Sequence, residues 1–248
     1  MAISIPSRLD MGRRVSRAKV PLLIAAAVFA LGAAGLFVSR SAAFHARGVE
    51  VVGASHLSVA EVLARADVST RTNVLWLDEG AVERRLEVDR WIAGADVRVS
   101  FPWTIEITVV ERTPVAIAVD GEAGVIVAAD GTALGPGGDM RRLPRIELPV
   151  TAMSEGAVAS ARGAALALGA MSRELRSRVS SVVVLADSTL ELRLDDEVVV
   201  RYGRVVEPRR KAWIVEQVLA WAELEGERLA VVNVVSTESP AVELWPDA

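Results

Sequence analysis

Residues 95–109 read ADVRVSFPWTIEITV, and the alternation within this stretch decides the fold around it. Polar and apolar side chains take turns on both sides of Pro102-Trp103. The apolar positions are Ala95, Val97, Val99, Phe101, Ile105, Ile107 and Val109. Because successive side chains of a β-strand point to opposite faces, this pattern predicts two strands joined by a hairpin, each with one buried and one wet face.

Two short helices are predicted before the hairpin. Ser58 and Glu61 have the spacing of a capping box, in which both side chains bind free N–H groups at a helix start. Asp78 is the expected N-cap of a second helix, over 79–88. The residues expected to face inward on the two helices are Val59, Val62, Leu63, Val82, Leu86 and Val88. With a strand at 49–53, the predicted order is β-α-α-β-β.

Further out, the run Val20 to Val38 contains no charged residue and follows five basic residues in the first nineteen positions. At about 1.5 Å per residue it nearly covers the ~30 Å hydrocarbon core of a bilayer. We expect one transmembrane helix over 20–38, with 1–19 as a cytoplasmic tail because basic residues stay inside. Residues from about 41 onward would then lie outside the cytoplasm.

A cleavable signal peptide is the alternative interpretation of this run. Ser41-Ala42-Ala43 offers small residues just after it. However, the run is longer than the ~7–15 residues of a typical signal-peptide core, and Arg40 lies where a cleavage site favours small neutral side chains. Both features favour a retained helix.

Several segments in and around the β-α-α-β-β stretch carry a recognisable pattern. They are 49–53, 73–78 (NVLWLD), 91–97 (WIAGADV), 101–107 (FPWTIEI) and 110–116 (VERTPVA). In this order, after one membrane helix, they resemble the FtsQ family of bacterial division proteins. The resemblance implies an α+β chain with a POTRA domain over 45–116 and an FtsQ-type β domain over 117–248.

The second domain is expected to be a mixed β domain with two helices. Asp130-Gly131 predicts a hairpin turn after a strand at 125–127, and residues 143–146 are expected to be extended. The helices are predicted at 155–175 and 208–224, and Pro208 suits the first turn of the latter. Further strands are predicted at 181–185, 189–194, 198–202, 229–235 and 241–244.

The chain departs from the family pattern near its C-terminus. The family commonly has an acidic residue in the penultimate strand, where this chain has Asn233. Residues 235–239 also match poorly. These differences bear on any transfer of partner contacts from the family to individual side chains here.

Charge and composition exclude several kinds of ligand. Subtracting the +5 of residues 1–40 from the whole-chain net charge of −4 leaves −9 for residues 41–248. An acidic exported part disfavours nucleic acid as its main ligand, because that would require a basic face. The absence of cysteine excludes disulfides and thiolate metal sites.

Catalytic patterns are equally scarce. His45 and His56 are the two histidines of the chain, too few to indicate a metal site or a catalytic triad. Ser16 and Lys19 have a Ser-x-x-Lys spacing but no companion motifs, and Asp195-Asp196 is typical of a turn. We therefore expect no enzyme activity, no cofactor, no metal and no small-molecule substrate.

Six tryptophans raise the question of a binding surface. Large aromatic side chains usually fill cores, so we expect Trp76, Trp91, Trp213 and Trp221 to be packed inside. Trp103 at the hairpin tip and Trp245 near the end of the chain are the better interface candidates.

A non-enzymatic protein can bind a partner by pairing an edge strand of its sheet with a strand of the other chain. An edge strand presents unpaired N–H and C=O groups, so a partner strand can add to it. We expect residues 241–245, backed by 229–235, to form this receiving edge. The candidate partner-binding residues are Val232, Val234, Ala241, Val242, Leu244 and Trp245. The alternative is an ordinary terminal strand protected by Glu238, Glu243 and Pro246.

The resemblance implies partners of the FtsB and FtsL type, with septal wall synthases as further partners. It also implies a non-enzymatic, single-pass scaffold of the division machinery in the cytoplasmic membrane, enriched at the septum. The other function considered is a POTRA-bearing component of a secretion or envelope-assembly system, but such proteins usually carry repeated POTRA modules or a membrane β-barrel.

Overall fold

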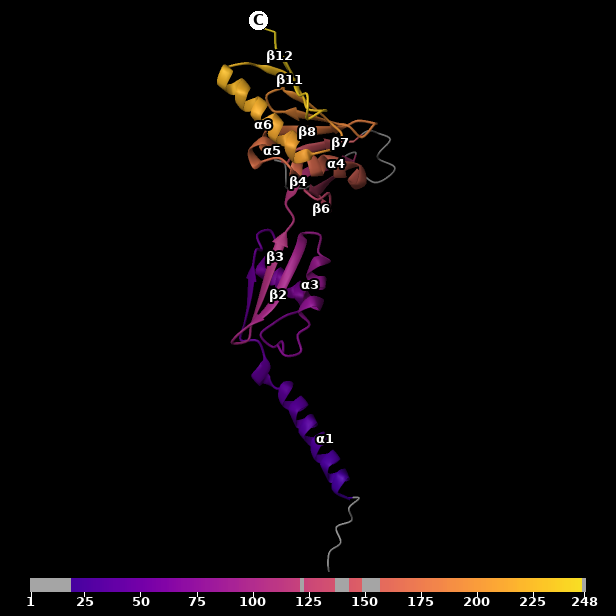
Figure 1. The fold of residues 1–248 in the computed structure, drawn as a ribbon, viewed down its shortest axis with the longest axis vertical. Helices are drawn as coiled ribbons and strands as arrows, with labels where there is room; N and C mark the ends of the chain where they lie inside the picture. Colours follow the sequence, from indigo (N-terminus) through magenta and orange to yellow (C-terminus); the bar gives the residue numbers. More distant parts are fainter. Residues whose placement is uncertain (1–18, 121–122, 137–142, 149–156, 247–248) are drawn as a thin grey trace, which may run out of the picture.

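The computed structural model describes residues 19–120, 123–136, 143–148 and 157–246. Three parts follow one another along its long axis: a helix, a small three-stranded domain and a larger β-rich domain (Figure 1). The predicted α+β fold, with one N-terminal apolar helix, is confirmed.

The first part is the helix α1, Lys19–Ser39. Its stretch Pro21–Ser39 is long and apolar enough to cross a membrane, spanning about 28 Å at 1.5 Å per residue. None of its side chains is buried against the rest of the protein, and Phe29 and Phe37 are about 80% exposed. An apolar helix with no protein cover fits a single-pass membrane protein.

The small domain has the predicted order β-α-α-β-β. It consists of β1 Gly48–Val52, α2 Val59–Ala66, α3 Glu79–Glu87, β2 Ile92–Ser100 and β3 Thr104–Glu111. The sheet order is β1-β3-β2, with β2 and β3 joined as the predicted antiparallel hairpin and β1 parallel to β3.

Both predicted helix caps of this domain are confirmed. Ser58 and Glu61 form the full capping box, and the Asp78 side chain accepts a hydrogen bond of 2.9 Å from the Ala81 N–H. The core is formed by the inner faces of the sheet and both helices. Its fully buried members include Val62, Ala66, Val82, Leu86, Ile92, Ile105 and Ile107.

Three residues expected in this core lie in solvent instead: Val59 is 50% exposed, Val88 83% and Phe101 88%. Val59 lies on the same face of α2 as Val62 and Ala66, but it is the first residue of the helix, at its exposed end. Val88 follows the last turn of α3, and Phe101 lies in the hairpin turn, where the alternation of strand faces ends.

Two residues connect the small domain to the next strand, β4 Pro114–Asp120. One of them, Arg112, spans the connection. Its Nε donates to Asp130 Oδ2 at 2.8 Å, and its guanidinium also donates to the carbonyl oxygens of Arg90 and Ile92. Arg112 therefore ties the end of the small domain to a turn of the large one.

The large domain is built on a sheet whose described strands have the order β12-β11-β10-β9-β8-β7-β4-β5-β6. Besides β4, these are β5 Ala123–Ala128, β6 Ala133–Pro136, β7 Arg145–Glu147, β8 Val179–Val184, β9 Leu190–Leu194, β10 Val199–Gly203, β11 Leu229–Asn233 and β12 Ala241–Leu244. The predicted hairpin at Asp130-Gly131 is confirmed. The strands predicted at 181–185, 189–194 and 198–202 are also present, and they pair as the antiparallel meander β8-β9-β10.

Three helices accompany this sheet: α4 Ala157–Gly169, α5 Arg173–Arg178 and α6 Pro208–Glu225. The single helix predicted over 155–175 is wrong, and its first two residues lie outside the described residues. Helix α4 ends at Gly169. This glycine lies so close to Ala129 that a Cβ added to it would be 2.7 Å from the Ala129 Cβ. Ser172 then caps α5 by accepting from the Leu175 N–H.

Helix α6 begins with Pro208 in its first turn, as predicted, and buries Ala212, Val215, Leu219 and Ala222. It also buries Lys211, which is 2% exposed. The Lys211 Nζ donates to the carbonyl oxygens of Tyr202 at 2.7 Å and Arg204 at 3.0 Å, and burial lowers its pKa. Lys211 thus fastens the connection between β10 and α6.

The expectation that four tryptophans fill the core is wrong for three of them. Trp76 is 55% exposed, Trp213 59% and Trp221 42%. The two on α6 are eight residues apart and line one pocket on a flank of the helix, together with Thr237 and Pro240. Trp91 is partly buried and packs against the cores of both domains.

Candidate functional site

Among the described residues the two sheets end in four edge strands, β1 and β2 in the small domain and β6 and β12 in the large one. An edge strand can receive another chain only if its outward main-chain groups are accessible. The edges at β2 and β12 differ sharply in this respect.

The outer edge of β2 is closed by a row of carboxylates from α3. Glu79 accepts a hydrogen bond of 3.0 Å from the Val99 N–H, Glu83 one of 2.9 Å from the Val97 N–H, and Glu87 one of 3.4 Å from the Ala95 N–H. Each acceptor is a glutamate Oε1, and the donors are every second N–H along β2.

This match arises from the repeats of the two elements. Four residues of an α-helix rise about 6 Å, and two residues of a strand rise about 6.7 Å. Glutamates at every fourth helix position therefore keep pace with alternate N–H groups of an adjacent strand. The carboxylates of α3 take the place of a neighbouring strand, and an incoming strand would have to displace all three.

The strand β12 lies at the other end of the molecule from α1 (Figure 1). It pairs antiparallel with β11, so that Ala241 is opposite Asn233 and Val242 opposite Val232. Within the described part of the chain, no strand pairs with the outer side of β12. No hydrogen bond from a side chain covers that side in the described residues either, unlike at β2.

The hydrogen bond of the residue after β12 shows which N–H groups of the strand point outward. The Trp245 N–H donates to the carbonyl oxygen of Arg228, toward β11, at 2.8 Å. Because N–H groups of a strand alternate sides, those of Val242 and Leu244 point away from β11. They are the donors that a partner strand would meet.

The side chains of β12 are exposed along its whole length. Val242 is 38% exposed, Leu244 42% and Trp245 43%. The middle of the strand carries one charge, Glu243, which accepts a hydrogen bond of 3.2 Å from Arg201 on β10. The edge therefore presents apolar side chains on one face of the strand and, on the other, a carboxylate that is paired with Arg201.

The six candidate residues lie on or directly beside two adjacent strands, but they fall into two groups. Ala241, Val242, Leu244 and Trp245 are exposed, whereas Val232 and Val234 are 0% exposed and belong to the core of the domain. The side chains of these two valines do not face solvent. They anchor β11, the strand that pairs with β12, in the core of the domain.

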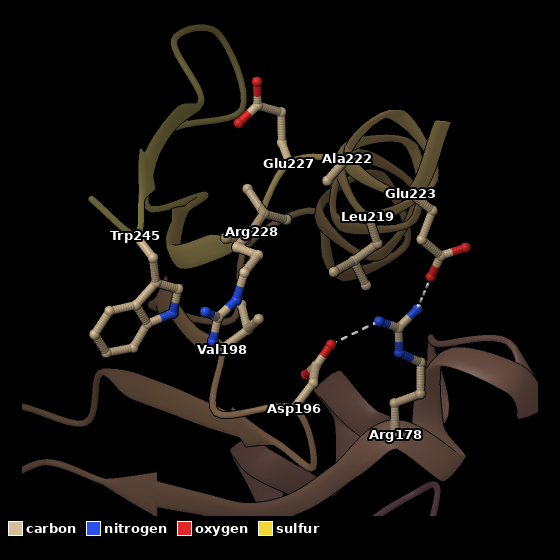
Figure 2. Close-up of a pocket in the computed structure, with 10 residues that line it drawn as sticks. Arg178, Asp196, Val198, Leu219, Ala222, Glu223, Glu227, Arg228 and Trp245 are labelled. Carbon is tan, nitrogen blue, oxygen red and sulfur yellow. Dashed lines mark hydrogen bonds and ion pairs between the residues drawn. The ribbon is translucent and has the colours of Figure 1, made fainter. Parts of the chain in front are cut away.

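A small pocket lies at the end of β12, next to the Trp245 indole (Figure 2). Arg178 lies at its rim and bridges Asp196 at 2.8 Å and Glu223 at 2.7 Å. Burial by itself would lower the pKa of Arg178, but these two carboxylates raise it. The apolar wall is formed by Val198, Leu219, Ala222 and Leu229.

Sequence reasoning did not identify this pocket. Arg178, Asp196 and Glu223 come from three elements far apart in the chain, so no local spacing signals their meeting. Asp196 was predicted only as a turn former, and it does follow β9 in the turn before β10.

Both histidines make contacts within the small domain and its connection to α1. His45 forms an isolated bridge with Asn73, and His56 stacks on Trp91 with ring centroids 3.6 Å apart. In the part of the chain that the structure describes, no group of three or more histidine or acidic side chains is placed to hold a metal ion.

Comparison with known proteins matches both domains to one family. Residues 44–112 match the POTRA domain of FtsQ type, and residues 116–234 match the C-terminal domain of the cell division proteins FtsQ and DivIB. The chain belongs to the FtsQ family. It is therefore a cell division protein of that family, and its small domain is a POTRA domain.

Individual FtsQ proteins support this assignment. The chain is 29% identical to the cell division protein FtsQ of Anaeromyxobacter sp. strain K, over 92% of this chain and 82% of that protein. It is 31% identical to FtsQ of Bradyrhizobium diazoefficiens over 66% of this chain and 46% of that one. For FtsQ of Mycolicibacterium smegmatis the identity is 28%, over 84% and 60%.

The FtsQ domain match ends at residue 234, before β12. Val232 and Val234 lie within the matched range, and Ala241, Val242, Leu244 and Trp245 lie beyond it. The case for β12 as a docking edge therefore rests on its own geometry in this FtsQ-family chain.

Proposed function

We propose that this FtsQ-family protein is a non-enzymatic, single-pass scaffold of the bacterial divisome. It receives a strand of a partner division protein at β12 on the outer face of the cytoplasmic membrane, and couples that partner to septal wall synthesis. Partners of the FtsB and FtsL type are proposed from the resemblance to the family, with septal wall synthases further along the assembly.

One observation carries this proposal: β12 is an end strand whose outward N–H groups, at Val242 and Leu244, meet no acceptor among the described residues. Its exposed apolar side chains are Val242, Leu244 and Trp245. When a partner strand adds to an edge, apolar side chains like these pack against alternate side chains of the partner. Such a site works by main-chain pairing, so the proposal includes no catalytic step and no cofactor.

The proposed topology places the tail 1–19 in the cytoplasm and both domains outside. Five basic residues in that tail support this orientation, and the length of α1 supports the membrane span. In Figure 1 the POTRA domain lies between α1 and the large domain, so the β12 edge is presented away from the membrane.

The test is a proline at the outward-facing position of β12. Val242→Pro removes an N–H that points away from β11, so the pairing of β12 with β11 can persist while strand addition cannot. We expect Val242→Pro to abolish co-purification with the FtsB-type partner. Val242→Thr, which keeps both the N–H and the branched side chain, should leave co-purification unchanged.

The readout is capture of the partner from membranes that contain each full-length variant at equal amounts. Unchanged capture by a folded Val242→Pro protein would refute docking at β12. A matching FtsQ-type domain in both exported parts supports division over the envelope-assembly alternative, and depletion should accordingly give filaments without septa.

A further inference from the structure

The end of the POTRA domain that faces α1 carries exposed apolar side chains. Phe101 at the β2–β3 hairpin is 88% exposed, and Leu75 and Trp76 in the loop before α3 are 47% and 55% exposed. The hairpin end lies beside the connection from α1 in Figure 1. We call this surface the aromatic base, comprising residues 73–77 and 101–103.

The aromatic base is bonded directly to the end of α1 and to the connection that follows it. The Asn73 side-chain amide donates to the carbonyl oxygen of Ser39, the last residue of α1, at 2.7 Å. The Val74 N–H donates to the carbonyl oxygen of Phe44 at 2.9 Å, and the Arg47 N–H to that of Trp103 at 2.8 Å. The domain therefore sits close against the end of the helix.

These contacts fix the depth of the base relative to a membrane. The polar zone on each side of the ~30 Å hydrocarbon core is only about 5–7 Å thick. Arg40 follows the apolar helix directly, and its guanidinium carbon lies 5.7 Å from the centre of the Trp76 ring. A residue in contact with Arg40 lies within this interfacial zone once α1 spans the bilayer.

The aromatic side chains form a continuous row from the connection to the hairpin tip. Phe44 and Trp103 have ring centroids 6.1 Å apart, and Trp103 and Phe101 6.3 Å apart. Tryptophan and other amphipathic aromatic side chains are favoured at the boundary between lipid and water. Phe101, at the end of this row, is 88% exposed. Contact with lipid would remove this apolar side chain from water.

The charges around the base suit lipid headgroups. Segments 40–47 and 71–78 contain Arg40, Arg47 and Arg71, all exposed, against one carboxylate, Asp78, which caps α3. Residues 41–248 as a whole carry a net charge of −9. A locally basic surface on an acidic chain is attracted to anionic phosphate groups at a membrane surface.

We propose that the aromatic base is a membrane-contact surface that inserts Phe101 and Trp76 into the headgroup region of the outer leaflet. The inference relies on the proposed membrane span of α1 and extends it to the folded domain. Contact at the base would hold the POTRA domain upright, so that the large domain and its β12 edge are held away from the lipid.

The chain has no cysteine, so single-cysteine variants can carry a spin label without background. Three positions on the full-length protein test the inference: Phe29→Cys in α1, Phe101→Cys in the base and Val88→Cys at the opposite end of the POTRA domain. Phe101 and Val88 are matched, with exposures of 88% and 83%. The protein is placed in nanodiscs of phosphatidylethanolamine and phosphatidylglycerol, and the depth of each label is measured from its collision rates with oxygen and with a water-soluble nickel complex.

The expected order of accessibility to the nickel complex is Phe29→Cys lowest, Phe101→Cys severalfold below Val88→Cys, and Val88→Cys as in water. Equal accessibility at 101 and 88, with label 29 buried, would overturn the membrane contact and leave the span intact. An accessible label at 29 would overturn the span and the contact together.

A second substitution separates lipid contact from local crowding. Trp76→Ser added to Phe101→Cys should move the label at 101 toward water, because it removes the inserted aromatic side chain that remains in that variant. Trp213→Ser, at a tryptophan of similar exposure far from the membrane, should leave the label unchanged. If both serine variants act alike, or neither moves the label, the aromatic base does not hold the domain at the lipid surface.

Discussion

The edge strands β2 and β12 have the same exposed position in their sheets but opposite availability. Beside β2, helix α3 places Glu79, Glu83 and Glu87 on the outward N–H groups. Beside β12, no such acceptor lies among the described residues, and apolar side chains are exposed instead. The availability of an edge is therefore set by what the neighbouring element presents to it, more than by the strand itself.

From this difference we infer that the two domains have separate tasks. The closed β2 edge protects the POTRA domain from non-specific pairing with other strands. The large domain keeps its open strand at the far end of the molecule (Figure 1). Open edges promote aggregation, so closure of β2 and exposure of β12 fit a chain in which strand addition is directed to β12.

The largest expected effect concerns the support beneath the open edge. Lys211→Met would leave the buried carbonyl oxygen of Tyr202 and the part-buried one of Arg204 without their donor, and unsatisfied buried acceptors are costly. We expect the unfolding free energy of the large domain to fall by about 3 kcal/mol, measured by urea unfolding in detergent.

The neighbouring exposed residue provides the control for this change. Arg210→Met should shift the same transition by less than about 0.5 kcal/mol, because Arg210 lies at the surface. Equal stabilities for the two variants would mean that Lys211 does not support the β10–α6 connection that carries β11 and β12.

The next effect tests the closed edge. Replacing Glu79, Glu83 and Glu87 together by alanine removes the three carboxylate acceptors of main-chain N–H groups, at about 1 kcal/mol each, and exposes three N–H groups of β2. We expect the triple variant to lose roughly 3 kcal/mol of POTRA stability and to self-associate as its concentration rises, which analytical ultracentrifugation would measure.

Glutamine at the same three positions separates charge from hydrogen bonding. The glutamine side-chain oxygen still accepts from an N–H, so the triple glutamine variant should stay monomeric. A triple alanine variant that remains monomeric at high concentration would show that the edge is closed by something other than these three side chains.

A smaller effect distinguishes β12 from the flank of α6 as the docking surface. Trp245→Ala removes a 43% exposed aromatic side chain beside the pocket in Figure 2. Buried aromatic side chains often dominate binding, so we expect the partner affinity to fall about tenfold, or ~1.4 kcal/mol, by surface plasmon resonance. Trp213→Ala should have no effect; a larger loss there would place the partner on α6.

The sequence predicted most of the fold because the decisive signals are local. The alternation at 95–109, the capping box at Ser58 and the proline at the start of α6 each depend on neighbouring residues. The spacing of Glu79, Glu83 and Glu87 is also visible in the sequence, but only the tertiary fold brings that face of α3 beside β2. Local pattern could not show which edge would be closed.

The candidate site was predicted as two strands, but not as side chains with different roles. Val232 and Val234 alternate with Asn233 and read equally well as contacts or as core, and the helices that cover their face bury them. The break after Gly169 was missed for a similar reason, because the close approach to Ala129 involves residues 40 positions apart. Periodicity gives a residue's face but not what covers it.

The smallest expected effect sharpens the comparison, because the carboxylate at Glu111 uses the same chemistry as the glutamates of α3. Glu111 accepts from the Ser55 hydroxyl at 2.6 Å and from the N–H groups of His56 and Leu57 at 2.8 and 2.9 Å. Here the carboxylate fastens a turn rather than an edge. Burial would raise the pKa of Glu111, but these three donors outweigh burial and lower it from 4.5 to about 2.

A folded-state pKa below the unfolded one means that the ionised form is stabilised by folding. That contribution is complete above the unfolded pKa of 4.5 and is lost as the pH falls toward about 2. Glu111→Gln should therefore lower stability modestly at neutral pH and flatten the loss of POTRA stability between these pH values, measured by thermal unfolding. Glu50→Gln, at an exposed position of β1, should leave the pH profile as it is. If Glu111→Gln retains the full acid dependence, the turn is not held by this carboxylate, and main-chain capping by glutamate would be a feature of the β2 edge rather than of the whole domain.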